Sequence, residues 1–281
     1  MKNHQLTQQQ IRAYTHHLQM EEKSGATMEK YLRDIRAFIC WLDGRDISKE
    51  LTSEWKSHLV SQDYAPTTVN AMLSALNSLL EFLDLRECRV KFLKIQRRLF
   101  RDADRELTKD DYQRLLNTAY KLGRERLGLL VETIGATGIR VSEVAYITVE
   151  AVQQGKAEIT LKGKIRTILL PGKLCRKLLK YAKQQKTASG EIFLTRNGTP
   201  LSRRQIWAEM KGLCKTAGVA ASEVFPHNLR HLFAAAFYRA SRDIVKLADV
   251  LGHSSLETTR IYLLTSGAEH QRQLDRLGLV S

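Results

Sequence analysis

The sequence predicts a mainly α protein with a small β-hairpin or sheet, an α+β chain of two domains. Apolar residues recur at helical spacing along most of the 281 residues. The one convincing pair of β segments, 157–161 and 165–170, flanks the turn Lys162-Gly163-Lys164. Helical periodicity fades over residues 91–106, where Arg and Lys are dense, so we expect a basic interdomain linker there.

The first domain is expected to span residues 1–90 and to consist of four short helices. Apolar stripes cover residues 11–18 and 28–42, and a shorter helix surrounds Trp55. Pro66 suits the first turn of the fourth helix, because its fixed φ is helical and its missing N–H is not needed there. These helices predict a compact bundle.

The second domain is expected to span residues 107–281. Thr108 and Asp111 have the spacing of a capping box, which marks the start of its first helix. The same criteria predict further helices at 127–134, at 174–186, after the Ser202–Gln205 box and at 268–277, a strand at 191–194, and a short helix carrying Glu143. Gly138 permits a turn just before Arg140.

The chain carries a net charge of +15, with a pI of about 9.8, and its basic residues run along its whole length. An excess this large favours a polyanionic partner, most commonly nucleic acid, over a charge that only aids solubility. No apolar stretch has the length of a signal peptide or a membrane span, so a soluble protein of the cytoplasm, with no membrane partner, is expected.

The four cysteines lie far apart and form no CxxC pair. Each falls within an apolar helical pattern, so all four are expected to be reduced core residues. The sequence has no zinc-ligand spacing, paired carboxylates at metal-ligand spacing or P-loop, so no metal and no cofactor are expected.

Residues 225–262 contain most of the candidate catalytic side chains of the chain. Arg230 follows His227 by three positions, which places both on one helix face, where they can grip the oxygens of one phosphate. Gly252 fits a helix end, and Ser254 with Glu257 predicts a capping box for the next helix. His253 is then in a fixed elbow, followed by Tyr262.

Cleavage of a phosphodiester needs positive charge on the non-bridging oxygens, a nucleophile and an acid for the leaving oxygen. Arg140 and Arg230 can supply the charge, Tyr262 the nucleophile, and Lys162 or Lys164 the acid. Each has an ordinary alternative: a helix tyrosine, an arginine paired with Glu143, or a charged turn residue. For His227 the alternative is a polar residue at a helix start. Only their combination favours metal-free phosphoryl transfer.

These motifs resemble the tyrosine recombinases of the phage-integrase and Xer family. The match consists of TGIRVSE at 137–143, HNLRH at 227–231, LGHSS at 251–255, and a tyrosine nine positions after His253. The basic hairpin tip, K-G-x-K in many members, is one residue shorter here, and we prefer Lys162, which precedes the glycine, over Lys164. Residues 107–281 carry the resemblance strongly, and the N-terminal helices resemble the core-binding domain of the family less specifically.

The resemblance implies a C-shaped clamp on duplex DNA and a 3′-phosphotyrosyl intermediate formed by Tyr262. Arg140, Arg230 and His253 would stabilise the phosphate, Lys162 would protonate the leaving oxygen, and His227 would accept the tyrosine proton. Glu143 would orient Arg140, and His231 would support the site.

The resemblance also implies a homotetramer on two DNA sites, reaching a Holliday junction during integration, excision or resolution. The helix at 268–277 is the candidate for exchange between protomers, with packing on its own domain as the alternative; accessory proteins are a further candidate partner. The short N-terminal region favours a Xer-like, integron-like or simple transposon integrase. The rival functions are a type IB topoisomerase and a non-catalytic DNA-binding protein, and the filled catalytic positions argue against the latter.

Overall fold

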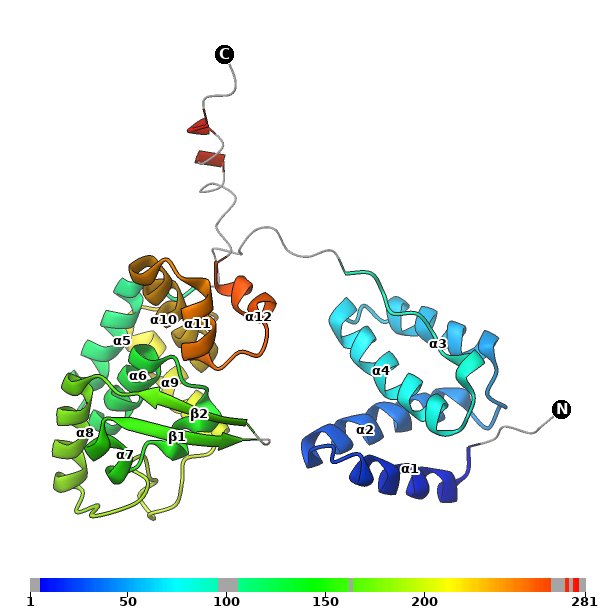
Figure 1. Cartoon of the computed structure of the whole chain (residues 1–281), viewed down its shortest axis with the longest axis horizontal. Coiled ribbons are helices and arrows are strands. Elements are labelled where there is room, and N and C mark those ends of the chain that lie inside the picture. The colour runs from blue at the N-terminus through cyan, green and yellow to red at the C-terminus, as the bar shows by residue number, and fades with distance from the viewer. Residues whose placement is uncertain (1–5, 96–105, 162–163, 264–270, 273–274, 278–281) are drawn as a thin grey trace. The chain divides into compact units, whose positions relative to one another are not determined.

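The computed structural model describes residues 6–95, 106–161, 164–263, 271–272 and 275–277. The chain divides into two compact units, Met1–Arg97 and Arg98–Ser281 (Figure 1). The described part confirms the predicted fold class, since it is mostly helical with one two-stranded antiparallel sheet. No helix in these residues is both long and apolar enough to cross a bilayer.

The N-terminal unit contains the four predicted helices, α1 (Gln8–Met20), α2 (Gly25–Leu42), α3 (Lys49–Ser61) and α4 (Pro66–Phe82), followed by the 3-10 turn η1 (Arg86–Cys88). Side chains of Thr7, Ser24 and Ser48 cap the first three helices, and Pro66 opens the fourth as expected. The buried apolar faces of these helices, with residues around η1, form the core of this unit.

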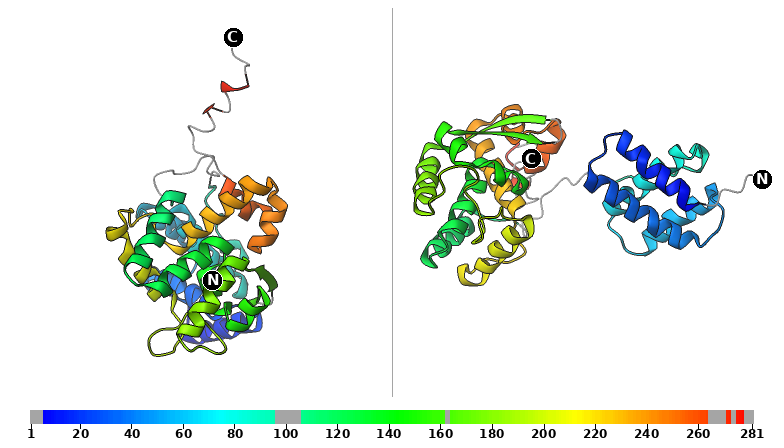
Figure 2. Two further views of the ribbon diagram at one scale, coloured as in Figure 1. Left: turned by 90° about the vertical axis from the view of Figure 1, so that its left-hand side faces the viewer. Right: turned by 90° about the horizontal axis from the view of Figure 1, so that it is seen from below.

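The C-terminal unit is built from more elements, and Figures 1 and 2 show its β-hairpin on one side of the helices. In chain order they are α5 (Lys109–Lys121), α6 (Glu125–Thr137), η3 (Val141–Tyr146), α7 (Val149–Gln154), β1 (Lys156–Leu161), β2 (Lys164–Leu169), α8 (Gly172–Gln184), α9 (Arg203–Ala217), α10 (Pro226–Ser241), α11 (Ile244–Leu251), α12 (Leu256–Arg260) and η4 (Ile261–Leu263). The predicted boxes at Thr108 and Ser202 cap α5 and α9.

The hairpin pairs β1 with β2 in a register that places Ile159 opposite Arg166 and Leu161 opposite Lys164. Ile168 and Leu170 are buried, whereas Ile165 and Leu169 are exposed, as the period of two requires. The large core of this unit gathers buried side chains from α5 through the start of α10, and a smaller cluster joins α10, α11 and Tyr262.

Three details of the sequence prediction are wrong. Residues 191–194 form two isolated bridges, from Glu191 to Thr148 and from Leu194 to Pro200, because neither end finds a partner strand to extend the pairing. Ser255, rather than Ser254, caps α12 and accepts from the Glu257 N–H. Cys40 is exposed on α2, while Cys88, Cys175 and Cys214 are buried as expected. Lys162, most of the 91–106 linker and much of the 268–277 helix lie outside the described residues.

Candidate active site

Arg230 occupies the centre of the candidate site, on the first turns of α10. Phe225 is extended and Pro226 takes the first helical position, so α10 begins abruptly and carries its first residues into the interior. The Arg230 side chain is buried, with 2% of the residue exposed. Its guanidinium donates to the carbonyls of Gly138 and Leu251, the latter at 2.7 Å. It is therefore fixed by backbone rather than by a carboxylate.

Gly138 makes this contact available because it ends α6 in the left-handed conformation, with φ of +64°. A Cβ at this position would lie 2.3 Å from the ring of Phe233, which belongs to α10. The glycine therefore allows α6 and α10 to approach closely and turns its carbonyl toward Arg230.

Arg140 follows this turn and pairs with Glu143. Its Nη1 donates to Oε1 of Glu143 at 2.9 Å, and its backbone N–H donates to Oε2 at 2.7 Å. The Glu143 side chain is 2% exposed, whereas the Arg140 side chain is 42% exposed. The ion pair with Glu143, which was the non-catalytic alternative for Arg140, is thus present. It still leaves the Arg140 guanidinium facing solvent, where it can bind an anion.

His253 is held between Arg230 and Thr259 in the elbow that follows α11. Gly252 ends α11 with φ of +64°. Nε2 of His253 lies 2.9 Å from Nη2 of Arg230, and Nδ1 lies 2.9 Å from Oγ1 of Thr259. Because an arginine can only donate, we infer that Nε2 accepts and that the ring proton is on Nδ1.

Tyr262 lies in η4, and 3% of the residue is exposed. Its hydroxyl accepts from Nε of Arg230 at 3.4 Å. The ring stacks on His253 with a centroid distance of 5.7 Å, and it lies 4.3 Å from the ring of His231. The phenol is thus placed beside the most buried arginine of the site.

His227 and His231 complete the ring of side chains around the phenol. The His227 ring lies 6.0 Å from that of Tyr262 and 4.7 Å from that of His231. Burial, together with Arg230 and Arg140, lowers the pKa of His227, so this imidazole is neutral at pH 7. A neutral imidazole beside a phenol can accept a proton from it.

The structure adds two residues that the sequence reasoning missed, Arg166 and Thr259. Nη2 of Arg166 donates to Oε2 of Glu143 at 2.5 Å, and its Nη1 donates to the Leu251 carbonyl. A signal for Arg166 was present, because strand alternation places it on the buried face with Ile168, where a charge needs a partner. Thr259 gave no comparable signal, since a threonine in a short helix is ordinary.

The described residues contain no group of three or more His, Cys, Asp or Glu side chains able to hold a metal ion. Of the two hairpin lysines, Lys162 is outside the described residues, and for Lys164 the structure describes the backbone only. The geometry thus brings together Arg140, Arg230, His227, His253 and Tyr262, with Glu143 and His231 beside them. This set can bind one anionic phosphate next to a phenol nucleophile.

Two family models match the chain. The model described as "Phage integrase family" matches residues 105–268, and the model described as "Phage integrase, N-terminal SAM-like domain" matches residues 11–87. The first match alone covers more than half of the 281 residues. It contains every candidate site residue named above.

Among curated proteins, the chain is similar to tyrosine recombinase XerA of Thermococcus kodakarensis, with 29% identity over 94% of this chain and 93% of the relative. It is also similar to tyrosine recombinase XerD of Vibrio vulnificus, with 26% identity over 84% of each chain. Among solved structures, a lambda integrase dimer bound to a COC′ core site matches with a TM-score of 0.72 and 17% identity, over 91% of this chain and 94% of the other. A XerH recombinase bound to its difH substrate matches with a TM-score of 0.69 and 19% identity, over 90% and 79%.

Proposed function

The chain belongs to the phage integrase family, and we propose that it is a site-specific recombinase that breaks and rejoins DNA through Tyr262. The single observation that carries the residue assignment is the burial of Arg230 with its Nε directed at the Tyr262 hydroxyl. A cation at this position stabilises the phenolate that must form, and it can also neutralise the phosphate that the phenolate attacks.

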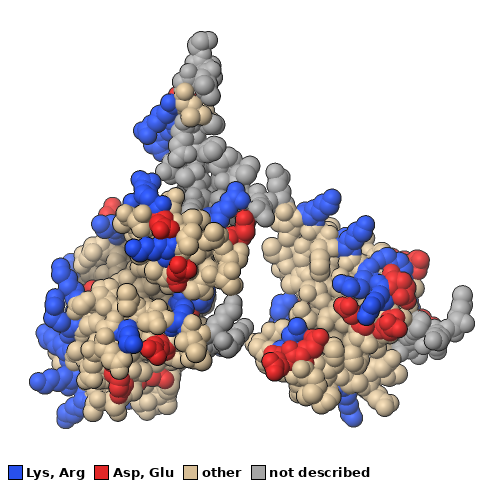
Figure 3. Space-filling view, viewed as in Figure 1, with Lys and Arg blue, Asp and Glu red and all other residues tan. Residues whose placement is uncertain are grey.

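Double-stranded DNA is the substrate. The net charge of +15 suits a partner that carries a phosphate at each nucleotide. Figure 3 shows Lys and Arg side chains spread over the drawn face of both units, with a row along the edge formed by α8. Similar solved structures are complexes with DNA, including lambda integrase as a tetramer bound to a Holliday junction.

In the proposed reaction the Tyr262 oxygen attacks the scissile phosphorus, and the bond from phosphorus to the 5′ oxygen breaks. The products are a 3′-phosphotyrosyl enzyme and a free 5′-hydroxyl. Arg140 and Arg230 contact the non-bridging oxygens as negative charge develops there. His253 joins them once its ring proton has moved from Nδ1 to Nε2, which then donates to an oxygen instead of accepting from Arg230. A 5′-hydroxyl from the partner duplex then attacks the phosphotyrosine, which restores the phosphodiester and needs no nucleotide cofactor.

Two proton transfers accompany each cleavage. His227 is the proposed acceptor of the phenolic proton, since it is neutral and its ring lies 6.0 Å from that of Tyr262. The proposed donor to the leaving 5′ oxygen is Lys162, with Lys164 as the alternative. His231 packs against both Tyr262 and His227 and supports their orientation.

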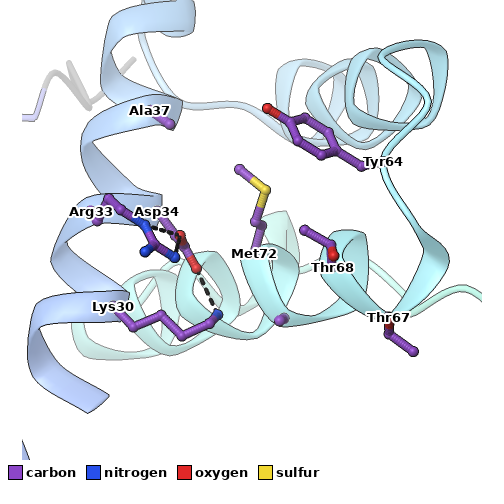
Figure 4. Close-up of a pocket in the computed structure, with 9 residues that line it drawn as sticks. Lys30, Arg33, Asp34, Ala37, Tyr64, Thr67, Thr68 and Met72 are labelled. Carbon is purple, nitrogen blue, oxygen red and sulfur yellow. Dashed lines mark hydrogen bonds and ion pairs between the residues drawn. The ribbon is translucent and has the colours of Figure 1, made fainter. Parts of the chain in front are cut away.

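The N-terminal unit presents a pocket between α2 and α4 that suits contact with DNA (Figure 4). Lys30 and Arg33 both pair with the buried Asp34, and Thr67 and Thr68 line the opposite side on the first turn of α4. Cations and hydroxyls of this kind contact phosphate oxygens and position a protein on a duplex. We propose that this surface of the N-terminal unit contacts DNA.

The active assembly is proposed to be a homotetramer on two DNA sites, because strand exchange needs a nucleophile at each of four strands. Exchange of the 268–277 segment between protomers belongs to this proposal, as does a place for accessory proteins. We place the reaction in the cytoplasm, since the relatives come from microbes whose chromosomes lie there.

Covalent trapping tests the proposal. Wild type and Tyr262→Phe are mixed with nicked duplexes covering the DNA that flanks the gene, and adducts are separated on denaturing gels. We expect an adduct with wild type alone and equal DNA binding by both proteins, since only a hydroxyl is removed. An adduct with Tyr262→Phe would refute the nucleophile assignment, and sequencing the trapped DNA gives the target site.

The trapped site also separates recombination from topoisomerase activity. A recombinase joins strands between two duplexes that carry the site, whereas a type IB topoisomerase relaxes any supercoiled plasmid without exchanging strands. DNA affinity should fall steeply with salt in either case, because many phosphate contacts release counterions. Arg33→Ala should lower both the affinity and the steepness of this dependence.

A further inference from the structure

Arg166 is a partly buried arginine on β2 that none of the proposed catalytic steps uses. Its side chain is 14% exposed. Nη2 donates to Glu143 at 2.5 Å, while Nη1 donates to the carbonyls of Leu251 and Val250, the latter at 3.4 Å. One side chain thus ties the hairpin strand to η3 and to the last turn of α11.

Two of the three partners of Arg166 are each shared with a proposed catalytic arginine. The Glu143 carboxylate accepts from Arg140 through Oε1 and from Arg166 through Oε2. The Leu251 carbonyl accepts from both Arg166 and Arg230, the latter at 2.7 Å. Arg166 is therefore the link between the carboxylate that orients Arg140 and the carbonyl that orients Arg230.

The packing around Arg166 leaves little freedom for this link. A Cβ on Gly252 would lie 2.4 Å from Cδ of Arg166, so the elbow that carries His253 closes directly over the arginine stem. Nε of Arg166 is buried without a hydrogen-bond partner. Burial lowers the pKa of Arg166, and the nearby cations Arg230 and Arg140 lower it further, whereas Glu143 raises it. The three arginines are therefore close enough to affect one another's charge. Leaving the Nε donor of Arg166 unpaired costs free energy.

We propose that Arg166 is a positioning residue for the recombination reaction, setting Arg140 and Arg230 jointly at the spacing that one phosphate needs. This inference rests on the proposed function. It predicts a specific defect, because the two arginines act on the negative charge of the non-bridging oxygens. Loss of Arg166 should therefore slow cleavage more when the scissile group carries this negative charge than when the charge has been removed.

The test compares two scissile groups in the nicked site recovered by trapping. One is the natural phosphodiester, and the other is a methylphosphonate, in which a neutral methyl replaces one charged non-bridging oxygen. For Arg166→Met we expect adduct formation on the phosphodiester to slow by about 100-fold relative to wild type, as for other small misplacements of reacting groups. On the methylphosphonate the same variant should fall by roughly tenfold or less, since less charge needs stabilisation.

Arg126→Met is the matched control. Arg126 also joins a carboxylate and a backbone carbonyl, at Glu209 and Leu194, and its side chain is 24% exposed. We expect this variant to react like wild type on both substrates. If Arg166→Met does not fold, as judged by thermal unfolding and DNA binding, Arg166→Lys is used, because lysine keeps the charge but lacks the fork that reaches both partners.

Equal losses on both substrates would show that Arg166 only supports the fold and would overturn the inference. An unimpaired, folded Arg166→Met or Arg166→Lys would also overturn it. If wild type forms no adduct with any DNA, the proposed function itself fails, and the role of Arg166 fails with it. If wild type forms the adduct but Arg166→Met slows by the same factor on both substrates, only the positioning role is rejected and the proposed function stands.

Discussion

His253 is surrounded by groups that disfavour its protonation. Burial comes first, followed by Arg230, Arg140 and Arg166, and together they lower the pKa of His253 to about 4. The hydrogen bond that Nε2 accepts from Arg230 requires the same neutral ring. In the unfolded chain this histidine has a pKa near 6.5, so the two states differ in proton binding between these values.

From this difference we predict a pH effect on stability. Above pH 6.5 His253 is neutral in both states and has no effect. As the pH falls from about 6.5 to about 4, the unfolded chain takes up a proton that the folded chain refuses, so the free energy of unfolding falls. Denaturant unfolding of wild type and His253→Asn at pH 7 and pH 4.5 checks this. An identical pH dependence in both proteins would contradict it.

Thr259 is fully buried, and its Oγ1 lies 2.9 Å from Nδ1 of His253. Thr259→Val keeps the shape but leaves the ring proton without its acceptor, so stability should fall by about 1–2 kcal/mol. Thr259→Ser keeps the hydroxyl and should retain the His253 orientation. Adduct rates and denaturant midpoints of the two variants give the comparison. A serine variant slower than the valine variant would argue against the hydrogen bond.

Short sequence motifs predicted which residues form the site better than they predicted the hydrogen bonds and packing among them. His227 and Arg230 at a helical offset, and His253 after a helix-ending glycine, are local patterns that sequence displays directly. The contacts of Arg166 join residues 23 and 85 positions apart, and no local pattern encodes such distances. The burial of Tyr262 likewise depends on how α10 and α11 pack.

Among the elements, α6 and α10 depend on one glycine. Gly138 has φ of +64°, and a Cβ there would lie 2.3 Å from Phe233. Gly155 is a matched control, since it ends α7 with φ of +71° and a Cβ there would meet nothing within 4 Å. Gly155→Ala should cost about 1 kcal/mol of unfolding free energy through backbone strain alone. Gly138→Ala should cost roughly 1–3 kcal/mol more, because Phe233 must move.

The Gly138 substitution should also reduce cleavage, since the same residue's carbonyl accepts from Arg230. Urea unfolding and covalent trapping of the two alanine variants give the two measurements. Equal stability losses in both variants would mean that α6 and α10 can separate at no cost.

Helices were predictable because their signals are local. The boxes at Thr108 and Ser202 and the proline at residue 66 lie where helices begin. The strand predicted at 191–194 failed because a strand exists only if a partner pairs with it, and here Glu191 and Leu194 bridge to different segments. At the start of α12, adjacent serines were equally good caps, and the backbone placed Ser255 at the extended position.

At the scale of the whole molecule, the described residues form cores that stay within each unit. The clusters of the N-terminal unit involve residues between Leu6 and Leu93, and those of the C-terminal unit involve residues between Leu107 and Tyr262. No residue belongs to the clusters of both units. Cooperative unfolding follows shared buried contacts, so each unit should unfold as its own cooperative body.

Leu76→Ala and Leu130→Ala test this independence. Leu76 is 1% exposed in the N-terminal core, and Leu130 is fully buried in the C-terminal core, so each substitution should cost its own unit about 2–5 kcal/mol. In hydrogen-exchange mass spectrometry, Leu76→Ala should speed exchange in α1 to α4 and leave α5 to α10 unchanged. Leu130→Ala should give the reverse pattern. Faster exchange across both units in either variant would mean that the chain unfolds as a single body, because the destabilisation would then have crossed from one core to the other.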